Sequence, residues 1–382
     1  MNLYQTVLLS LIKQIQNSNY QGWDPFDGLN SNFVRNSFIK DVPLLCLLWI
    51  QIFKRSPINF RKIAVVPKNY NVKGLALLIR GYITLYRINE DKIYLEKAIY
   101  LAKIILTLKS NNRVHLCFGY NFHWEARAFS VPAFTPNMIV SSFVGQSFLD
   151  IYDITSENTW LKHALDIGNF IESELILSEN NDEICFGYIP DEKVVVHNAN
   201  LMGSCYFGRL NHIVNKSKYK ELSFKSSLFT INRQLLDGSW YYGENDHHKW
   251  IDNFHTGYNL VSLKQIQDYL RHNLWVKNIE KGLNFHLKNH FMDDMTPKYY
   301  SNKLYPIDIH NYAQGIITTT IFGNFDLSEK LLKNAIREMW DFNKKYFYYQ
   351  KERIFTNKIN YMRWGQAWMF YAITCYLKSK VI

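Results

Sequence analysis

The chain has few charged residues, few cysteines and no metal-binding motif. Of its 382 residues, 20% are charged and 47% are hydrophobic, so the composition predicts a folded globular protein. The five cysteines are odd in number, widely spaced and without a CxxC pair, which indicates reduced core residues in a cytosolic protein. Because neither HExxH nor a Cys/His quartet occurs, we expect no metal and no cofactor.

Motifs for nucleotides and nucleic acids are also missing. The glycine patterns GxGxxG and GxxxxGK[ST] do not occur, which argues against a conventional sugar-nucleotide transferase or kinase. The net charge is +11, but the Lys and Arg residues are scattered, with no basic tract longer than a pair. We therefore expect no nucleic-acid partner, and an anionic glycan fits this charge better.

No stretch of the sequence has the pattern of a signal peptide or a membrane span. The apolar stripe of residues 1–18 is interrupted by Gln5, Ser10 and Lys13, as in an amphipathic helix. The longest apolar run, at 43–53, is about half of a membrane span and contains Gln51. The sequence predicts a cytoplasmic protein with at most peripheral contact with the inner membrane. The sequence does not indicate the oligomeric state.

Helical periodicity dominates what is present. It predicts a first helix at 3–17, followed by helices at 41–55, 72–86, 90–109, 135–153, 157–175, 198–213, 217–234, 255–269, 271–290, 309–321, 326–341 and 363–379. Almost no strand pattern occurs outside the loops, and no Pro/Ser-rich linker divides the chain. We therefore expect one domain over 1–382, with the N-terminal helix and cleft loop of residues 1–40 packed on it.

A repeat underlies these helices. Every 54–63 residues a long loop, usually rich in aromatic residues, precedes the second helix of a pair; the starting positions are Gly74, Asn137, Asn200, Gly257, Asn311 and Gly365. The other connections are short, so the long and variable loops all lie at one face of the helical array. Six such hairpins predict an all-α (α/α)6 toroid, with an extra N-terminal helix and short β-hairpin loops at the cleft, because closure buries faces that an open array exposes. An open α-solenoid and two stacked bundles are the alternatives.

The long loops carry the candidate site. The segment 237–260, DGSWYYGENDHHKWIDNFHTGYNL, mixes rings that stack on sugars with carboxylate and imidazole groups that move protons. The candidate catalytic residues are Asp24, Asp27, Glu125, His197, Tyr242, Asp252, His255, Asp308 and His310. The candidate substrate-binding residues are Trp23, Tyr120, Trp124, Arg127, Asn198, Trp240, Lys358, Tyr361, Arg363 and Trp364.

Each candidate also has a purely structural interpretation. Asp252 suits a helix N-cap as well as catalysis, and Asp308 occupies the equivalent place one repeat later. The segment around Asp24 also fits a stack of Asx-turns, and a lone histidine is often a satisfied core residue. Lys358 and Arg363 form either a clamp for a carboxylate or ordinary surface charge.

The motifs GYNFHWEARAFSVPAFTPN, DGSWYYG, WIDNFHTGY, YPIDIHNYAQ and KINYMRWGQAW together resemble an uncharacterised bacterial family, often called VpsJ-like, over nearly the whole chain. That family is found in capsule, O-antigen and exopolysaccharide gene clusters. Residues 124–154 are similar to the C-terminal helical domain of D-glucuronyl C5-epimerases, and the layout is similar to N-acylglucosamine 2-epimerases and six-hairpin glycosidases and lyases. The resemblance implies carbohydrate chemistry without fixing the reaction.

Three functions therefore stand as hypotheses. The first is an enzyme of cell-surface polysaccharide biosynthesis that removes a proton from an acidic glycan or lipid-linked glycan, as epimerases and lyases do. Its acid or base would be Tyr242, His255 or His197, with Lys358 and Arg363 neutralising the sugar carboxylate. The second is a glycoside hydrolase with two carboxylates drawn from Asp24, Asp27, Glu125, Asp252 and Asp308. The third is a non-catalytic glycan-binding scaffold that uses Trp23, Trp124 and Trp240.

Overall fold

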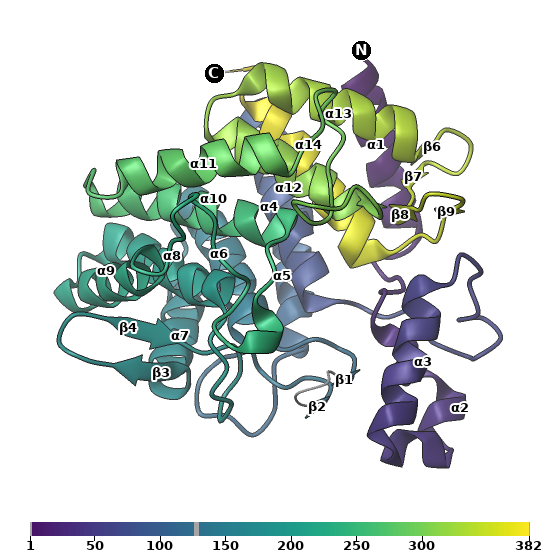
Figure 1. The fold of residues 1–382 in the computed structure, drawn as a ribbon, viewed down its shortest axis with the longest axis horizontal. Coiled ribbons are helices and arrows are strands. Elements are labelled where there is room, and N and C mark those ends of the chain that lie inside the picture. Colours follow the sequence, from purple (N-terminus) through teal and green to yellow (C-terminus); the bar gives the residue numbers. More distant parts are fainter. Residues whose placement is uncertain (1, 126–129, 382) are drawn as a thin grey trace.

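The computed structural model describes residues 2–125 and 130–381, and within them two concentric layers of helices form a ring (Figure 1). The inner helices are α4 (Val72–Asn89), α6 (Met138–Thr155), α8 (His197–Val214), α10 (Asn253–Leu270), α12 (Ile309–Ile321) and α14 (Trp368–Lys378). Each packs against the next, and α14 packs against α4, so the ring is closed. The predicted (α/α)6 toroid is confirmed.

The outer layer includes the N-terminal helix. Its members are α1 (Leu3–Asn17), α5 (Lys92–Thr107), α7 (Asn158–Glu174), α9 (Ser217–Ile231), α11 (Val276–Asn289) and α13 (Phe325–Met339). Helix α1 packs against α14, and the hydroxyl of Tyr4 donates to Glu329 on α13. We expected α1 to be an addition to six complete hairpins. Instead it fills the sixth outer place.

The two layers differ in sequence because they differ in burial. Inner helices such as α4 and α6 are buried on nearly all sides and are mostly apolar, whereas α11 and α13 bury one apolar stripe and expose charges. Close contacts between inner helices require small residues. A Cβ added to Gly145 on α6 would lie 2.3 Å from the Tyr206 hydroxyl on α8, and one added to Gly81 on α4 would meet Phe370 of α14 at the same distance.

All inner helices begin at the same end of the ring, which we call the mouth. Asparagine and aspartate side chains cap four of them by accepting a backbone N–H of the first turn; these are Asn71, Asn137, Asp252 and Asp308. The π-helical turn η4 (Met362–Ala367) leads into α14. The caps fix where each helix starts and therefore which side chains surround the mouth.

Short antiparallel strands occur in the connecting loops, as the predicted hairpins require. The pairs are β1 (Trp124–Glu125) with β2 (Ser130–Val131), β3 (Ile176–Glu179) with β4 (Ile184–Phe186), β6 (Trp340–Asp341) with β7 (Tyr346–Phe347), and β8 (Gln350–Lys351) with both β5 (Ile307–Asp308) and β9 (Thr356–Asn357). A short 3-10 turn, η3 (Asp246–His248), precedes α10.

A separate projection lies beside the ring, at the lower right of Figure 1. It contains η1 (Asp27–Asn30), α2 (Asn32–Arg35), η2 (Phe38–Asp41) and α3 (Pro43–Arg55), and we call residues 27–66 the α3 lobe. Its small core consists of Leu29, Val34, Cys46 and Ile50. The helix predicted at 41–55 therefore forms, but outside the ring. None of the helices in the described part of the chain has the length and apolar character needed to cross a membrane.

Candidate functional site

The first turn of α10 presents an aspartate–histidine pair at the mouth. One carboxylate oxygen of Asp252 accepts the backbone N–H of His255 at 3.0 Å, which caps the helix. The other accepts from His255 Nδ1 at 2.7 Å and from Trp250 Nε1 at 3.0 Å. Burial alone would raise the pKa of Asp252, but the His255 ring and these donors hold that pKa below its usual value. The carboxylate thus fixes the imidazole through Nδ1, and the partly exposed ring keeps Nε2 for a ligand.

A second histidine packs against the same Phe254 ring. His310, in the first turn of α12, shares a 2.5 Å hydrogen bond between Nε2 and the hydroxyl of Tyr258. Phe254 lies 4.2 Å from the His255 ring and 4.7 Å from the His310 ring, measured between centroids. Burial holds the pKa of His310 well below its usual value and raises that of Tyr258. Both groups are therefore neutral at pH 7 and able to exchange a proton.

Aromatic rings enclose these two groups. Tyr242 stacks on Trp250, with centroids 4.6 Å apart, and its other neighbour is His255 at 4.6 Å. Burial and the nearby Asp252 raise the pKa of Tyr242, which favours its neutral phenol form. Trp364 lies 4.7 Å from His310. The mouth has the ring-lined character of a sugar site.

Lys73 is a site residue that the sequence did not reveal. It begins α4 and is 3% exposed, and no carboxylate among the described residues lies within ion-pair distance. Its ammonium lies 4.6 Å from the centroid of Phe143, 5.2 Å from Trp368 and 5.5 Å from Tyr258. Burial and the Arg363 guanidinium hold the pKa of Lys73 well below its usual value. The one available signal was a lysine inside the apolar run VKGLALLI, since a lysine is rarely buried without a partner.

Arg363 does not form the expected clamp with Lys358. Its Nε and one terminal nitrogen donate to the two carboxylate oxygens of Asp24, at 2.6 and 2.8 Å. Its guanidinium lies 5.2 Å from the Tyr120 ring centroid. Lys358 is exposed, and its ammonium rests on Tyr348. Asp24 and Arg363 therefore neutralise one another, and Lys358 lies apart.

Asp308 is held by three donors. It accepts the backbone N–H of His310 at 2.7 Å, Trp364 Nε1 at 2.9 Å and Gln350 Nε2 at 2.6 Å. Burial raises its pKa to about 6, although these donors oppose the shift. The cap that the sequence suggested is therefore present, and the same side chain orients Trp364 toward the mouth.

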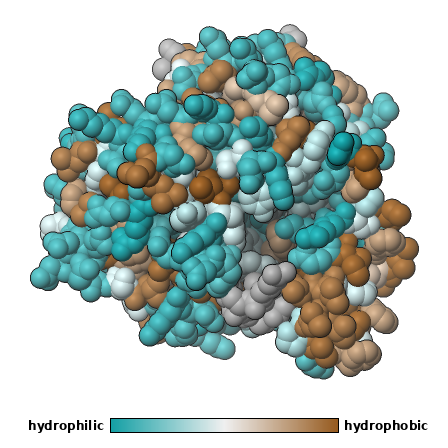
Figure 2. All heavy atoms as spheres, viewed as in Figure 1, coloured by the Kyte–Doolittle hydropathy of each residue, from teal (hydrophilic) through white to brown (hydrophobic). Residues whose placement is uncertain are grey.

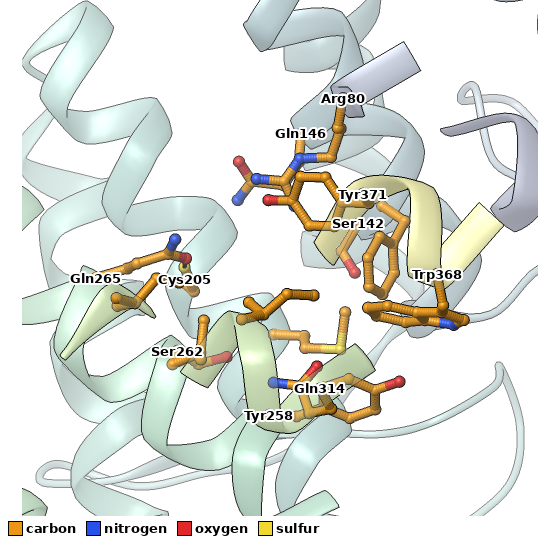
Figure 3. Close-up of a pocket in the computed structure, with 15 residues that line it drawn as sticks. Arg80, Ser142, Gln146, Cys205, Tyr258, Ser262, Gln265, Gln314, Trp368 and Tyr371 are labelled. Atoms are coloured by element: carbon orange, nitrogen blue, oxygen red, sulfur yellow. Dashed lines mark hydrogen bonds between the residues drawn. The ribbon is translucent and has the colours of Figure 1, made fainter. Parts of the chain in front are cut away.

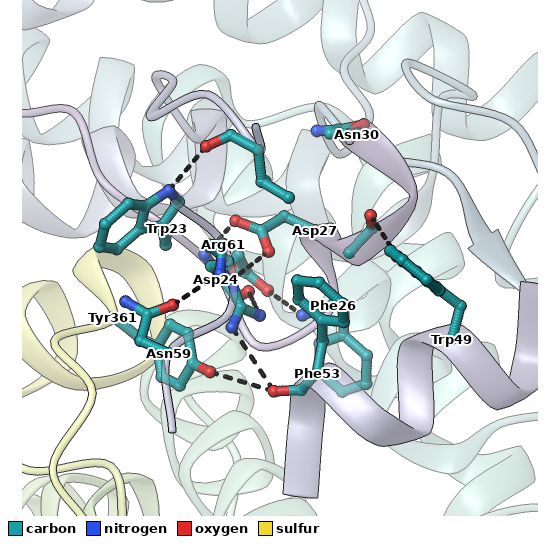
Figure 4. A network of polar contacts seen from close by, with 12 residues as sticks. Trp23, Asp24, Phe26, Asp27, Asn30, Trp49, Phe53, Asn59, Arg61 and Tyr361 are labelled. Atoms are coloured by element: carbon teal, nitrogen blue, oxygen red, sulfur yellow. Dashed lines mark hydrogen bonds and ion pairs between the residues drawn. The ribbon is translucent and has the colours of Figure 1, made fainter. Parts of the chain in front are cut away.

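Several expected site residues belong to the junction between ring and α3 lobe (Figure 4). Asp27 pairs with the buried Arg61 at 2.6 Å. Trp23 Nε1 donates to the Val66 carbonyl at 3.0 Å, and Tyr361 is buried with its ring 4.8 Å from the Arg61 guanidinium. These residues fix the lobe and do not line the mouth.

Others lie in the core or at its edge. Trp240 is packed among apolar residues such as Leu260 and donates Nε1 to the Thr230 carbonyl, so it has no free face for a sugar. His197 is buried between Glu244 and Thr230, at 2.6 and 3.2 Å. Asn198 is 3% exposed. Our assignment of Trp240 and His197 to the mouth was wrong, because ring type alone does not say which way a side chain points.

The remaining loop candidates are Trp124, Glu125 and Arg127. Trp124 lies 6.2 Å from Tyr188, a partly buried tyrosine beside Tyr120. Arg127 and the side chain of Glu125 lie outside the described residues. Among the described residues, no three His, Cys, Asp or Glu side chains converge as a metal site would need.

A hollow continues along the ring axis beyond the mouth (Figure 3). Its empty volume, including open solvent, is about 570 Å³, and it is lined by residues farther along the inner helices, among them Gln146, Cys205, Ser262 and Tyr371. Phe143, Tyr258 and Trp368 also line it. Because Lys73 contacts the same three rings but does not line the hollow, the rings separate the hollow from the mouth.

Comparisons with known proteins give a fold but no family. No family model matches the chain, and no curated protein matches it. Among solved structures, it is similar to cellobiose 2-epimerase from Bacillus thermoamylovorans B4167, with 10% identity, 83% of this chain and 90% of that chain covered, and a TM-score of 0.65. It is also similar to a D-mannose isomerase, with 10% identity, 82% of this chain and 87% of that chain covered, and a TM-score of 0.62. A third similar structure is an unsaturated glucuronyl hydrolase specific for heparin, with 13% identity, 81% of this chain and 87% of that chain covered, and a TM-score of 0.59. At these identities the likeness establishes the shared toroid alone.

Proposed function

We propose that this protein is a carbohydrate-active enzyme that removes a proton from a sugar carbon beside a carbonyl or carboxyl group, as an epimerase or lyase does. The proposal depends on one observation: the Asp252–His255 pair and the Tyr258–His310 pair flank Phe254 within one ring-lined mouth. Two groups that can each take or give a proton are what inversion at a carbon requires.

The roles follow from how each group is held. Asp252 holds His255 through Nδ1, so Nε2 is the atom that takes the proton, and the carboxylate stabilises the imidazolium that forms. Burial keeps Tyr258 and His310 neutral, so their shared proton is the one delivered to the opposite face in an epimerase, or to the leaving oxygen in a lyase. The neighbouring rings of Trp250 and Trp364 suit the faces of a pyranose.

The site favours an acidic substrate. Asp24 balances the charge of Arg363, whereas Lys73 has no carboxylate partner among the described residues. The starts of the inner helices add partial positive charge at the mouth. Burial lowers the pKa of Lys73, and a bound sugar carboxylate would raise it again; the resulting ammonium would stabilise the charge that develops on the sugar carboxylate or enolate oxygen when the carbon loses its proton. Cell-surface polysaccharide biosynthesis in the cytoplasm, with a glycan or lipid-linked glycan as substrate, remains our proposal for the setting.

A hydrolase that uses two carboxylates is less well supported. The carboxylates of Asp24, Asp27, Asp252 and Asp308 are each held in structural ion pairs or hydrogen bonds. A general acid must release its proton to the substrate, and these oxygens face protein donors. A scaffold without activity would not need two proton-exchanging pairs so close together.

The test is exchange with heavy water. The purified protein would be incubated in D₂O with uronic-acid-containing oligosaccharides and with neutral sugars such as cellobiose and mannose. We expect deuterium at the carbon that loses its proton, detected by NMR, and no deuterium with His255→Asn. Release of reducing ends without deuterium incorporation would instead identify a hydrolase.

A further inference from the structure

The α3 lobe exposes an apolar surface that no other part of the described chain covers. Leu44, Leu48 and Ile52, spaced by four residues, form one face of α3 and are 65, 51 and 54% exposed. Phe38 and Ile63 extend this face and are 73 and 81% exposed. Figure 2 shows hydrophobic residues gathered over the lobe at the lower right. Soluble monomers rarely leave a patch of this kind open unless it binds something.

The exposed charges of the lobe are mostly positive. Arg35, Lys40, Arg55 and Lys62 are exposed on the lobe, and Asp41 is its single exposed acid. An apolar face bordered by cations is the pattern of a surface that lies in the interface of an anionic bilayer. There the apolar side chains enter the acyl boundary and the cations meet lipid phosphates.

We propose that the α3 lobe docks this protein on an anionic lipid surface. A second copy of the chain is the competing occupant. In a symmetric dimer the same patch would face itself, so the cations of one lobe would approach those of the other. An anionic bilayer removes this repulsion and supplies the complementary charge. Helix α3, with 13 residues, is too short to cross the bilayer, so the lobe lies on the surface.

The lobe is rigidly connected to the mouth of the ring. Arg61 in the lobe donates to the carbonyl of Asp24 at 2.7 Å, and the carboxylate of Asp24 pairs with Arg363 at the mouth. Asn30 donates to the carbonyl of Asn121, in the loop that also carries Tyr120. Docking through the lobe therefore holds the mouth close to the lipid surface. The inference stands on the lobe alone and does not require the proposed reaction.

The experiment is vesicle co-sedimentation of the full-length protein. Vesicles of phosphatidylcholine with phosphatidylglycerol would be compared with pure phosphatidylcholine, at low salt and at about 0.15 M salt. We expect binding to the anionic vesicles that weakens as salt rises. Leu44→Gln/Leu48→Gln and Lys40→Gln/Lys62→Gln should each lower the apparent affinity by about tenfold or more.

Matched controls lie outside the lobe. Leu236→Gln replaces a leucine that is 95% exposed, and Lys277→Gln/Lys330→Gln removes two exposed lysines of α11 and α13. These variants should bind as the unaltered protein does, and circular dichroism should show that all variants fold. The proposal is overturned if the unaltered protein does not bind anionic vesicles, or if lobe and control variants lose affinity equally. It is also overturned if sedimentation velocity shows a dimer that Leu44→Gln/Leu48→Gln dissociates.

Discussion

His255 and His310 occupy similar positions on neighbouring inner helices but are held by different partners. The buried carboxylate of Asp252 accepts a hydrogen bond from Nδ1 of His255, whereas the hydroxyl of Tyr258 shares a hydrogen bond with Nε2 of His310. The first partner orients the ring through Nδ1, and the second leaves a neutral imidazole in surroundings where burial opposes charge. In the proposed reaction, one type of side chain would thus provide both a base and a neutral proton carrier.

Replacement of Asp252 by asparagine should separate capping from catalysis. Asparagine caps a helix as well as aspartate does, so α10 should keep its start. The neutral amide cannot stabilise a charged His255, and we expect turnover to fall by about 10²- to 10⁴-fold. Steady-state rates and thermal melts would be measured together. Unchanged turnover would contradict the role of Asp252, and a large loss of melting temperature would show that the cap had failed.

Asp308 should make stability depend on pH. Its pKa is about 6 in the folded protein and 3.8 as its ordinary value, so between these values the folded state binds a proton that the unfolded state has released. The free energy of unfolding should therefore fall as pH rises from about 4 to above 6, by up to about 3 kcal/mol. Urea titrations across this window would show the fall in the unaltered protein and in the exposed control Asp326→Asn. Asp308→Asn should show a shallower fall, because burial also raises the pKa of Asp27 to about 6 and that group still contributes. Equal slopes in all three proteins would refute the assignment.

At the scale of elements, the inner helices depend on residues that are small where helices touch. Gly145 faces the Tyr206 hydroxyl, which itself donates to the carbonyl of Ala164 at 2.6 Å and so is not free to move. The distance between α6 and α8 is therefore set by the absence of a side chain. The same holds for α4 and α14 at Gly81.

Gly145→Ala should destabilise the protein although alanine is the better helix former. The added Cβ would overlap Tyr206, and overpacking of this kind costs about 1–3 kcal/mol beyond the gain of about 1 kcal/mol from helix propensity. Gly187→Ala is the control, because its nearest neighbours would be 3.7 Å away. Chemical denaturation of both variants gives the comparison. A Gly145→Ala variant as stable as the control would show that α6 and α8 can separate.

Periodicity predicts these elements well but not their layer. The helices expected at 3–17 and 41–55 both form, as α1 and α3, yet their places are exchanged with respect to our prediction. Both are amphipathic, and which one joins the ring depends on contacts with α13 and α14 that the pattern does not encode. In the same way, Asp252 and His255 are visible at a helix start. Lys73 and Tyr258 lie inside apolar helix patterns, where a site residue looks like a packing residue.

At the scale of the whole molecule, one ion pair joins the two ends of the chain. Asp24 and Arg363 are 339 residues apart and form a bidentate pair that is almost fully buried. The pair attaches the segment before the α3 lobe to the start of α14. It thus contributes to both ring closure and lobe position.

Arg363→Met should destabilise the protein strongly, because it leaves the Asp24 carboxylate buried without a partner. The expected cost is about 3–5 kcal/mol. The double variant Asp24→Asn/Arg363→Met should cost less than the sum of the two single changes, since it removes both charges. A double-mutant cycle from urea titrations measures the difference. Additive effects would mean that the two side chains do not interact in solution.

The three aromatic rings that contact Lys73 limit what can pass through the ring of helices. Phe143, Tyr258 and Trp368 are each under 8% exposed and obstruct the bore of the toroid. A long saccharide cannot be threaded from one side to the other, and whatever is released must back out through the entrance it used. Under the proposed function, the protein should then act at the end of a saccharide chain, one residue at a time, and leave internal units untouched.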